Sequence, residues 1–215
     1  MLRTALDYGM NDEYVFVVDD DADIRDSMRL LLEVAGFKVR NYTSARQFLD
    51  DESPKQGCLV ADIRMPDMSG LELQEEAARR HLDLPVIIMT GHGDVPLAVK
   101  AMKAGAIDFL EKPFDDERML ASVRRALEVG SRARSRNAEA IAAKTLLASL
   151  TPRERGVLDK LVQGRSNKVV AYELGISPRT VEIHRAHIMG KMEASSLSDL
   201  VRVVLAAEQA SNGQA

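Results

Sequence analysis

The sequence predicts an α/β domain with a parallel sheet, followed by a smaller all-α domain. Short apolar runs alternate with helical stretches up to about residue 130, which is typical of a parallel sheet covered by helices on both faces. Beyond about residue 149, apolar residues recur at helical spacing and turn residues separate several short helices. The chain has 215 residues, 46% of them hydrophobic, so it is long enough for two ordinary domains.

The composition favours a cytoplasmic protein. No segment approaches the ~18 consecutive apolar residues that a membrane span needs, and the N-terminus lacks the apolar core of a signal peptide. The single cysteine, Cys58, lies in a predicted strand and is interpreted as a small buried hydrophobe, so metal clusters of Cys and His are excluded.

The charge is distributed unevenly along the chain. Residues 1–130 carry 16 basic and 25 acidic groups, whereas residues 131–215 carry 13 and 8. This asymmetry suggests a cation or phosphoryl site in the first part and a polyanion as the partner of the second.

The first domain is expected to alternate five strands with five helices. Runs of β-branched and other apolar residues predict the strands, and apolar residues three or four apart predict the helices. Asp94 and Asp115 are expected to cap the last two helices. The strands are expected at 14–18, 37–42, 58–61, 85–89 and 107–110, and the helices at 24–35, 44–49, 71–81, 95–104 and from 116 onwards.

The last of these helices has no clear end. The sequence that follows is rich in Ala, Arg, Glu and Leu, with only Gly130 as a weak breaker, so residues 131–148 are predicted to form a helical linker. A disordered linker is the alternative. Residues 1–12 are expected to be a polar leader, residues 13–130 the α/β domain and residues 149–210 the helical domain.

The second domain contains a predicted helix-turn-helix. Thr151 and Glu154 form a capping box with Pro152 at the first helical position, and Ser166 and Ser177 are expected to cap the next two helices. Two short helices joined by a tight turn make a motif whose second helix enters the DNA major groove. The helices are expected at about 152–163, 167–174, 178–192 and 198–208.

Polar residues stand where four predicted strands end: Asp19 and Asp20, Asp62, Thr90 and Lys112. Parallel strands bring these ends to one edge of the sheet. Three converging carboxylates would repel one another unless a cation lay between them, and oxygen ligands suit Mg²⁺. A carboxylate at Asp62 can then attack a phosphoryl donor, with Thr90 and Lys112 contacting the phosphoryl oxygens. Each residue alone has an ordinary role as a cap, turn or loop residue; the combination favours a site.

The sequence at these strand ends resembles the response-regulator receiver family over roughly residues 13–130. The matching motifs are Val18-Asp19-Asp20, Asp62-Ile63-Arg64-Met65-Pro66, Thr90-Gly91 and Lys112-Pro113-Phe114. The resemblance implies a flavodoxin-like (βα)5 domain that a sensor histidine kinase phosphorylates on Asp62. It also implies a cis Lys112–Pro113 peptide and a switch role for Phe109. The implied Mg²⁺ ligands are Asp20, Asp62 and the main-chain carbonyl of Arg64, with Asp19 binding directly or through water.

The second domain resembles the LuxR/NarL-type four-helix DNA-binding domains, beginning at Thr151-Pro152-Arg153-Glu154. The strings from Ser177 to His187 and from Thr90 to Val99 resemble the FixJ-like subgroup. Helical spacing places Val181, Ile188 and Met192 on one buried stripe.

The exposed flanks of the recognition helix supply the candidate DNA contacts. Basic side chains there suit phosphates or guanine edges, whereas an acidic or apolar one can contact a cytosine amino group or a thymine methyl. His184 is left open between a backbone contact and a helix–helix hydrogen bond. The candidates are Lys168, Arg179, Thr180, Glu182, Ile183, Arg185, His187 and Lys191.

Together these features predict a transcription factor that phosphorylation at Asp62 activates, rather than a turnover enzyme. The implied partners are double-stranded DNA, a sensor histidine kinase, a second copy of the chain and RNA polymerase. One alternative is a Mg²⁺-dependent phosphohydrolase with an aspartyl-phosphate, although Arg64 stands where its second acid-base Asp is needed. Another is an adaptor that has lost DNA binding, which the basic second half disfavours.

Overall fold

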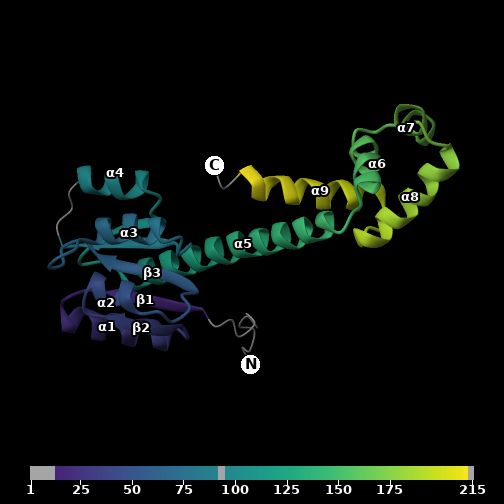
Figure 1. Ribbon diagram of the computed structural model, residues 1–215. Coiled ribbons are helices and arrows are strands. Elements are labelled where there is room, and N and C mark those ends of the chain that lie inside the picture. Colours follow the sequence, from purple (N-terminus) through teal and green to yellow (C-terminus); the bar gives the residue numbers. More distant parts are fainter. Residues whose placement is uncertain (1–12, 92–94, 213–215) are drawn as a thin grey trace, which may run out of the picture. The chain divides into compact units, whose positions relative to one another are not determined.

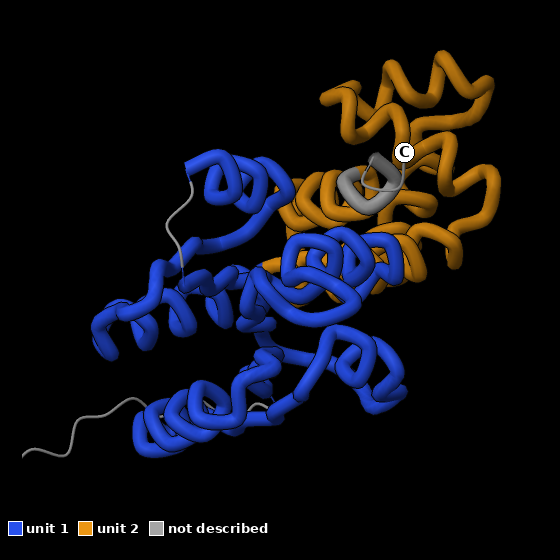
Figure 2. Tube along the Cα trace, turned by 90° about the vertical axis from the view of Figure 1, so that its left-hand side faces the viewer, with its two compact units in different colours: residues 1–132 blue, residues 133–215 orange. Residues whose placement is uncertain are grey.

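The computed structural model describes residues 13–91 and 95–212, with the side chains of the last four left out. The chain divides into two compact units, residues 1–132 and 133–215, which Figure 2 colours separately. The predicted cap Asp94 and the predicted leader 1–12 lie outside the described residues. In the described part of the chain, every helix is too short or too polar to cross a membrane.

The first unit contains a five-stranded parallel sheet in the order β2-β1-β3-β4-β5. Figure 1 labels β1, β2 and β3 among the helices of this unit. The strands are β1 Tyr14–Val18, β2 Lys38–Tyr42, β3 Gly57–Asp62, β4 Val86–Thr90 and β5 Asp108–Glu111. The helices are α1 Ala22–Val34, α2 Ala45–Asp50, α3 Gly70–Arg79, α4 Val95–Lys103 and the start of α5 Asp116–Ala148. The predicted order of strands and helices is confirmed, with bounds that differ by a few residues.

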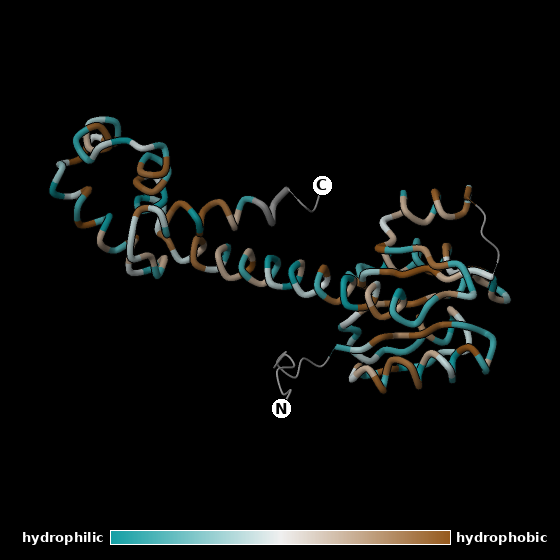
Figure 3. The backbone as a smooth tube through the Cα atoms, turned by 180° about the vertical axis from the view of Figure 1, so that it is seen from behind, coloured by the Kyte–Doolittle hydropathy of each residue, from teal (hydrophilic) through white to brown (hydrophobic). Residues whose placement is uncertain are grey.

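Helices cover both faces of this sheet. On one face, alternate strand residues such as Phe16 and Ile88 pack against α2, α3 and α4. On the other face, their neighbours such as Val17 and Ile87 pack against α1 and α5. Figure 3 shows the hydrophobic stretches of the strands between more polar helices. Because successive side chains point to opposite faces, an uninterrupted apolar strand can serve both cores.

Capping groups begin several of these helices. Of the two possible caps Thr43 and Ser44, Ser44 caps α2, and the Oδ1 atom of the predicted cap Asp115 accepts the Glu117 N–H at the start of α5. Two further caps are present: Asp21 accepts two N–H groups at the start of α1, and Ser69 forms a capping box with Glu72 at α3. A side-chain acceptor satisfies N–H groups that have no partner within the first helical turn.

The helix α5 is continuous over 33 residues. Residues 131–148 therefore lie within a helix, and the alternative of a disordered linker is wrong. Gly130 does not interrupt the helix, because one internal glycine disfavours it by only about 1 kcal/mol.

The second unit contains α6 Pro152–Val162, α7 Asn167–Leu174, α8 Pro178–Lys191 and α9 Leu197–Asn212, together with the end of α5. The capping box of Thr151 and Glu154 and the cap by Ser177 are confirmed. Ser166 holds the predicted N-cap position of α7, but its side chain makes no capping hydrogen bond, which corrects the prediction. Gly175 ends α7 with a φ of 65°, the left-handed conformation that glycine adopts without strain. The predicted core stripe on α8, made of Val181, Ile188 and Met192, is fully buried.

Candidate functional site

The carboxyl edge of the sheet brings the predicted acidic residues together. Asp19 follows β1, and Asp62 is the last residue of β3; their exposed fractions are only 1% and 6%. Thr90 ends β4 and is buried, opposite Glu111 in the register of β5. The parallel pairing places these strand ends side by side, as the sequence predicted.

Lys112 joins the two buried carboxylates. Its Nζ atom lies 2.7 Å from Oδ2 of Asp19 and 2.7 Å from Oδ1 of Asp62. Removing either partner of such a group would leave a buried charge without compensation, which is strongly unfavourable. The peptide that follows, Lys112–Pro113, is cis, as the family resemblance implied.

Burial and ion pairing act in opposite directions on these groups. Burial raises the pKa of the Asp19 carboxyl, against the hydrogen bonds that it accepts from Lys112 and from the Asp21 N–H. Burial by itself would lower the pKa of Lys112, but its hydrogen bonds to Asp19 and Asp62 raise that pKa overall. Lys112 therefore stays charged at neutral pH and compensates the carboxylates.

The turn after β3 wraps closely around Asp62. The Arg64 N–H donates a 2.6 Å hydrogen bond to Oδ2 of Asp62. Gly70, the first residue of α3, lies so near that a Cβ atom there would be 2.3 Å from the Asp62 carbonyl oxygen. Its N–H donates to the carbonyl of Ile63 at 3.1 Å. The glycine therefore allows α3 to begin directly against the end of the strand.

The predicted Mg²⁺ ligands are only partly assembled. Asp19 and Asp62 face the same ammonium group, whereas Asp20 is exposed. Among the described residues, no group of three or more His, Cys, Asp or Glu side chains is arranged to hold a metal ion. The donors nevertheless fit Mg²⁺ in kind, since they are carboxylate and carbonyl oxygens and two of them already share one cationic partner.

The predicted switch residue Phe109 lies on β5, in register with Ile88 of β4. It is half-buried and packs on the core face that α2, α3 and α4 cover. Thr90 lies two residues after Ile88, so both predicted switch residues belong to the same pair of neighbouring strands.

The predicted DNA contacts line α8 and the start of α7 with different exposures. The exposed ones are Lys168, Arg179, Glu182, His187, Lys191 and Ile183, and the exposed fraction of Ile183 is 51%. Two others, Thr180 and Arg185, are half-buried. The hydroxyls of Thr180 and Ser177 lie 2.8 Å apart, and Nη1 of Arg185 lies 3.4 Å from Oδ1 of Asn167.

Lys191 has a structural partner that sequence reasoning missed. Its Nζ atom donates to Oε2 of Glu154 at 2.7 Å and to the Ser149 carbonyl at 3.3 Å. The Glu154 side chain is buried, and Nδ1 of His187 lies 4.0 Å from its second oxygen. The capping-box motif was visible in the sequence; the lysine 37 residues later was not recognisable as its partner.

One ring nitrogen of His184, the residue left open between a backbone contact and a helix–helix hydrogen bond, makes no hydrogen bond to the described residues. This nitrogen, Nδ1, is buried.

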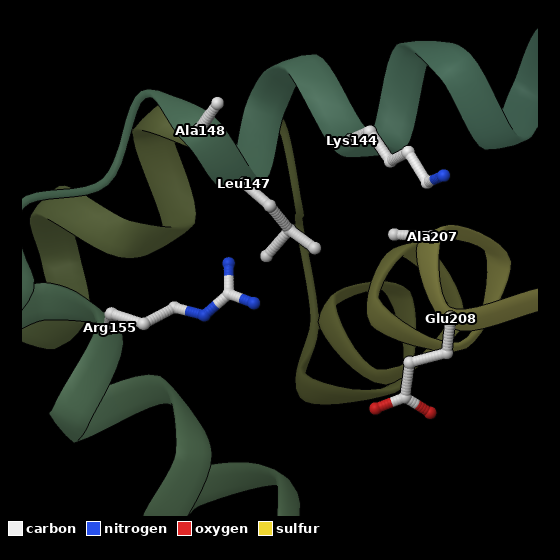
Figure 4. A pocket seen from close by; sticks show the side chains of 6 residues that line it. All are labelled: Lys144, Leu147, Ala148, Arg155, Ala207 and Glu208. Carbon is white, nitrogen blue, oxygen red and sulfur yellow. The ribbon is translucent and has the colours of Figure 1, made fainter. Parts of the chain in front are cut away.

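A shallow pocket of about 360 Å³ lies within the second unit (Figure 4). It is lined by Lys144, Leu147 and Ala148 of α5, Arg155 of α6, and Ala207 and Glu208 of α9. These six residues include none of the predicted site residues, so the candidate chemistry lies elsewhere.

Comparisons with known proteins agree with both halves of this description. Residues 15–124 match the response regulator receiver domain, and residues 148–204 match the LuxR family of bacterial regulatory proteins. The transcriptional regulatory protein FixJ of Azorhizobium caulinodans is 53% identical, with 90% of this chain and 92% of the relative covered. FixJ of Rhizobium meliloti is 48% identical, with 92% and 97% covered.

Solved structures of response regulators also match this chain. The response regulator StyR matches with a TM-score of 0.80 and 44% identity, covering 89% of this chain and 98% of the other. Full-length FixJ from B. japonicum matches with a TM-score of 0.57 and 47% identity, covering 92% and 98%. Relatives named as transcriptional regulators do not favour the phosphohydrolase or the adaptor. The chain therefore belongs to the two-component response regulators that join a receiver domain to a LuxR-type DNA-binding domain, and among them to the FixJ-like transcriptional regulators.

Proposed function

We propose that a phosphoryl group transferred to Asp62 controls the binding of the second domain to promoter DNA. The observation that carries this proposal is the shared contact of Lys112 with Asp19 and Asp62, each at 2.7 Å. A nucleophilic carboxylate, a second carboxylate and a cationic side chain are the groups that phosphoryl transfer onto an aspartate needs.

In the proposed reaction, one oxygen of Asp62 forms a bond to phosphorus while the bond from phosphorus to the histidine nitrogen of the kinase breaks. The Arg64 N–H, already bonded to Oδ2, orients the carboxylate. Lys112 exchanges its contact with Oδ1 for a contact with the new phosphoryl oxygens, so a buried negative charge remains compensated. The Thr90 hydroxyl is the proposed hydrogen-bond donor to the same group.

Asp19, Asp20, Asp62 and the main-chain carbonyl of Arg64 are the proposed ligands of Mg²⁺. When bound, the metal neutralises charge that develops on the transferred group. Asp19 stands on the buried side of this donor set and Asp20 on its solvent side.

The acyl phosphate is proposed to be a signalling state rather than an intermediate of turnover. Arg64 occupies the place where a hydrolase would carry its second acid-base carboxylate, and its side chain points to solvent. A phosphoryl group adds about −1.5 to −2 charges, which alters the hydrogen bonding of Thr90 and the packing of Phe109.

For DNA binding we propose that α8 enters the major groove. Arg179 and Lys168 are exposed basic groups near the starts of α8 and α7, and Glu182 and Ile183 are exposed beside them. One such domain offers few contacts, so specific binding calls for two copies on half-sites about one helical turn apart. We further propose a cytoplasmic protein that responds to a sensor histidine kinase and contacts RNA polymerase at promoters.

The decisive experiment compares Asp62→Asn with Asp67→Asn. Asp67 lies in the same turn, is exposed and has a φ of 66°, a conformation that Asn also tolerates. Each protein is treated with a small acyl phosphate donor and Mg²⁺, and its mass and its affinity for sequence-selected DNA are measured. Wild type and Asp67→Asn should gain one phosphoryl group and bind DNA more tightly, whereas Asp62→Asn should gain neither. A phosphate-dependent rise in DNA affinity of Asp62→Asn would refute the proposal.

A further inference from the structure

The main-chain carbonyl of Asp19 has a partner that the receiver motifs do not include. β1 ends at Val18, and the Asp19 N–H still donates to the Tyr42 carbonyl of β2 at 3.3 Å. The Asp19 carbonyl accepts a 2.7 Å hydrogen bond from Nη1 of Arg25, the fourth residue of α1. The peptide between Asp19 and Asp20 is thus held by a charged donor.

Arg25 is itself tied to the sheet. Nδ2 of Asn41, on β2, donates to the Arg25 carbonyl at 3.2 Å. The Oδ1 atom of Asn41 is buried and has no hydrogen-bond partner among the described residues. An unsatisfied buried acceptor disfavours folding, so the bond from Nδ2 to the Arg25 carbonyl is the interaction that offsets the burial of this amide.

The position of Arg25 is unfavourable for the helix alone. Its charge lies near the positive end of the α1 dipole, where acidic residues are preferred. Its half-buried guanidinium instead offers several N–H donors in a fixed plane, which suits a main-chain carbonyl at a set distance. The contact with Asp19 gives the arginine a local role that its helix position does not explain.

We propose that Arg25, whose main-chain carbonyl is bonded by Asn41, is a positioning residue for the metal-binding turn; this inference rests on the proposed function of the Asp62 site. The Asp19 side chain is fixed by Lys112 and by the Asp21 N–H. The Asp20 side chain is exposed, so its direction depends on the peptide that Arg25 holds. Loss of Arg25 lets this peptide rotate, and Asp20 then turns away from the other ligands for part of the time.

The test compares Arg25→Gln with Arg29→Gln in the full chain. Arg29 lies one turn further along α1, is exposed and pairs with Asp26, so both variants remove one charge from the same helix. Calorimetry without a phosphoryl donor measures the Mg²⁺ dissociation constant, and a Mg²⁺ titration of phosphorylation gives the half-saturating concentration and the maximal rate. Groups that orient metal ligands typically change affinity by 10–100-fold. Because Arg25 acts on a main chain, we expect a weakening of about tenfold.

For Arg25→Gln we expect the half-saturating Mg²⁺ concentration to rise by about the same factor, with a maximal rate and a melting temperature close to those of Arg29→Gln. Arg25→Lys, which keeps the charge without the planar donors, should recover only part of the affinity. Equal Mg²⁺ affinity of Arg25→Gln and Arg29→Gln would overturn the inference, as would a loss that follows a general fall in melting temperature. If wild type bound Mg²⁺ but gained no phosphoryl group on Asp62, the proposed function would fail instead.

Discussion

Nζ of Lys191 lies 2.7 Å from Oε2 of Glu154, so an ion pair joins the end of the proposed recognition helix to the capping box of α6. Glu154 is only 4% exposed and also accepts the Thr151 N–H. The Glu154 carboxylate therefore caps the start of α6 and also fixes the end of α8 through Lys191.

This pair predicts how the second domain responds to acid. The Lys191 hydrogen bond and then the Thr151 N–H lower the pKa of Glu154 from 4.5 to about 2. A carboxyl with a lowered pKa contributes stability above its unfolded pKa of 4.5, and this stability is lost as the pH falls towards 2. Glu154→Gln keeps the capping box but loses the ion pair with Lys191. The variant should therefore be less stable than wild type at pH 7, and it should lose less stability than wild type as the pH falls from 4.5 towards 2.

Scanning calorimetry of the whole chain between pH 7 and pH 2 measures this effect. Asp159→Asn is the control, because Asp159 is an exposed carboxylate of the same helix, 3.8 Å from Arg155. An acid profile of Glu154→Gln as steep as that of the control would contradict the role of the ion pair.

Arg185 is predicted to contribute to DNA binding without affecting the receiver. Its guanidinium is half-buried, and its 3.4 Å contact with Asn167 is long, so it can still reach a phosphate or a guanine. Arg185→Ala should weaken specific binding by about 1–3 kcal/mol if it contacts a base. Gel shifts at several salt concentrations measure this, while phosphorylation of Asp62 should be unchanged. Unaltered DNA affinity would remove Arg185 from the interface.

Lys112→Met is expected to make the receiver lose more stability than wild type does when the pH rises from acid to neutral. The hydrogen bond from Lys112 opposes the rise that burial causes in the pKa of Asp19, so this pKa rises further in the variant. A carboxyl whose folded pKa exceeds its unfolded value of 3.8 contributes stability below 3.8 that is lost as the pH rises through the folded pKa.

Melting temperatures from pH 4 to pH 8 test this prediction, with Lys103→Met, an exposed lysine at the end of α4, as the control. The two variants should differ most at the neutral end of the range. Parallel curves would show that Lys112 does not compensate the buried carboxylates.

Gly70→Ala should destabilise the receiver. The added methyl group would lie 2.3 Å from the Asp62 carbonyl oxygen, and relieving such overpacking typically disfavours a fold by about 1–3 kcal/mol. Gly190→Ala, on α8, meets nothing within 4 Å and should be neutral or stabilising. Urea unfolding of both variants checks the contrast; a neutral Gly70→Ala would mean that α3 can shift away from β3.

The element order and the location of the acidic site were accessible from sequence because both depend on local patterns. Apolar runs and helical spacing identify strands and helices, and a parallel sheet necessarily collects its strand ends at one edge. The sequence alone therefore predicts that one edge of the sheet carries Asp19, Asp62, Thr90 and Lys112. The cap at Ser69 was missed, although serine is typical of helix starts.

The contacts between distant parts of the chain required the tertiary structure. By itself the sequence determined the two domain types, the α8 core stripe and the set of groups at the sheet edge, because periodicity and motif spacing encode them. Only the fold decided that Lys112 bridges Asp19 and Asp62, that Arg25 holds the Asp19 carbonyl and that Lys191 pairs with Glu154. Each of these is a directional hydrogen bond whose partners are chosen by packing, and residue types alone do not specify which of many donors comes within about 3 Å of an acceptor.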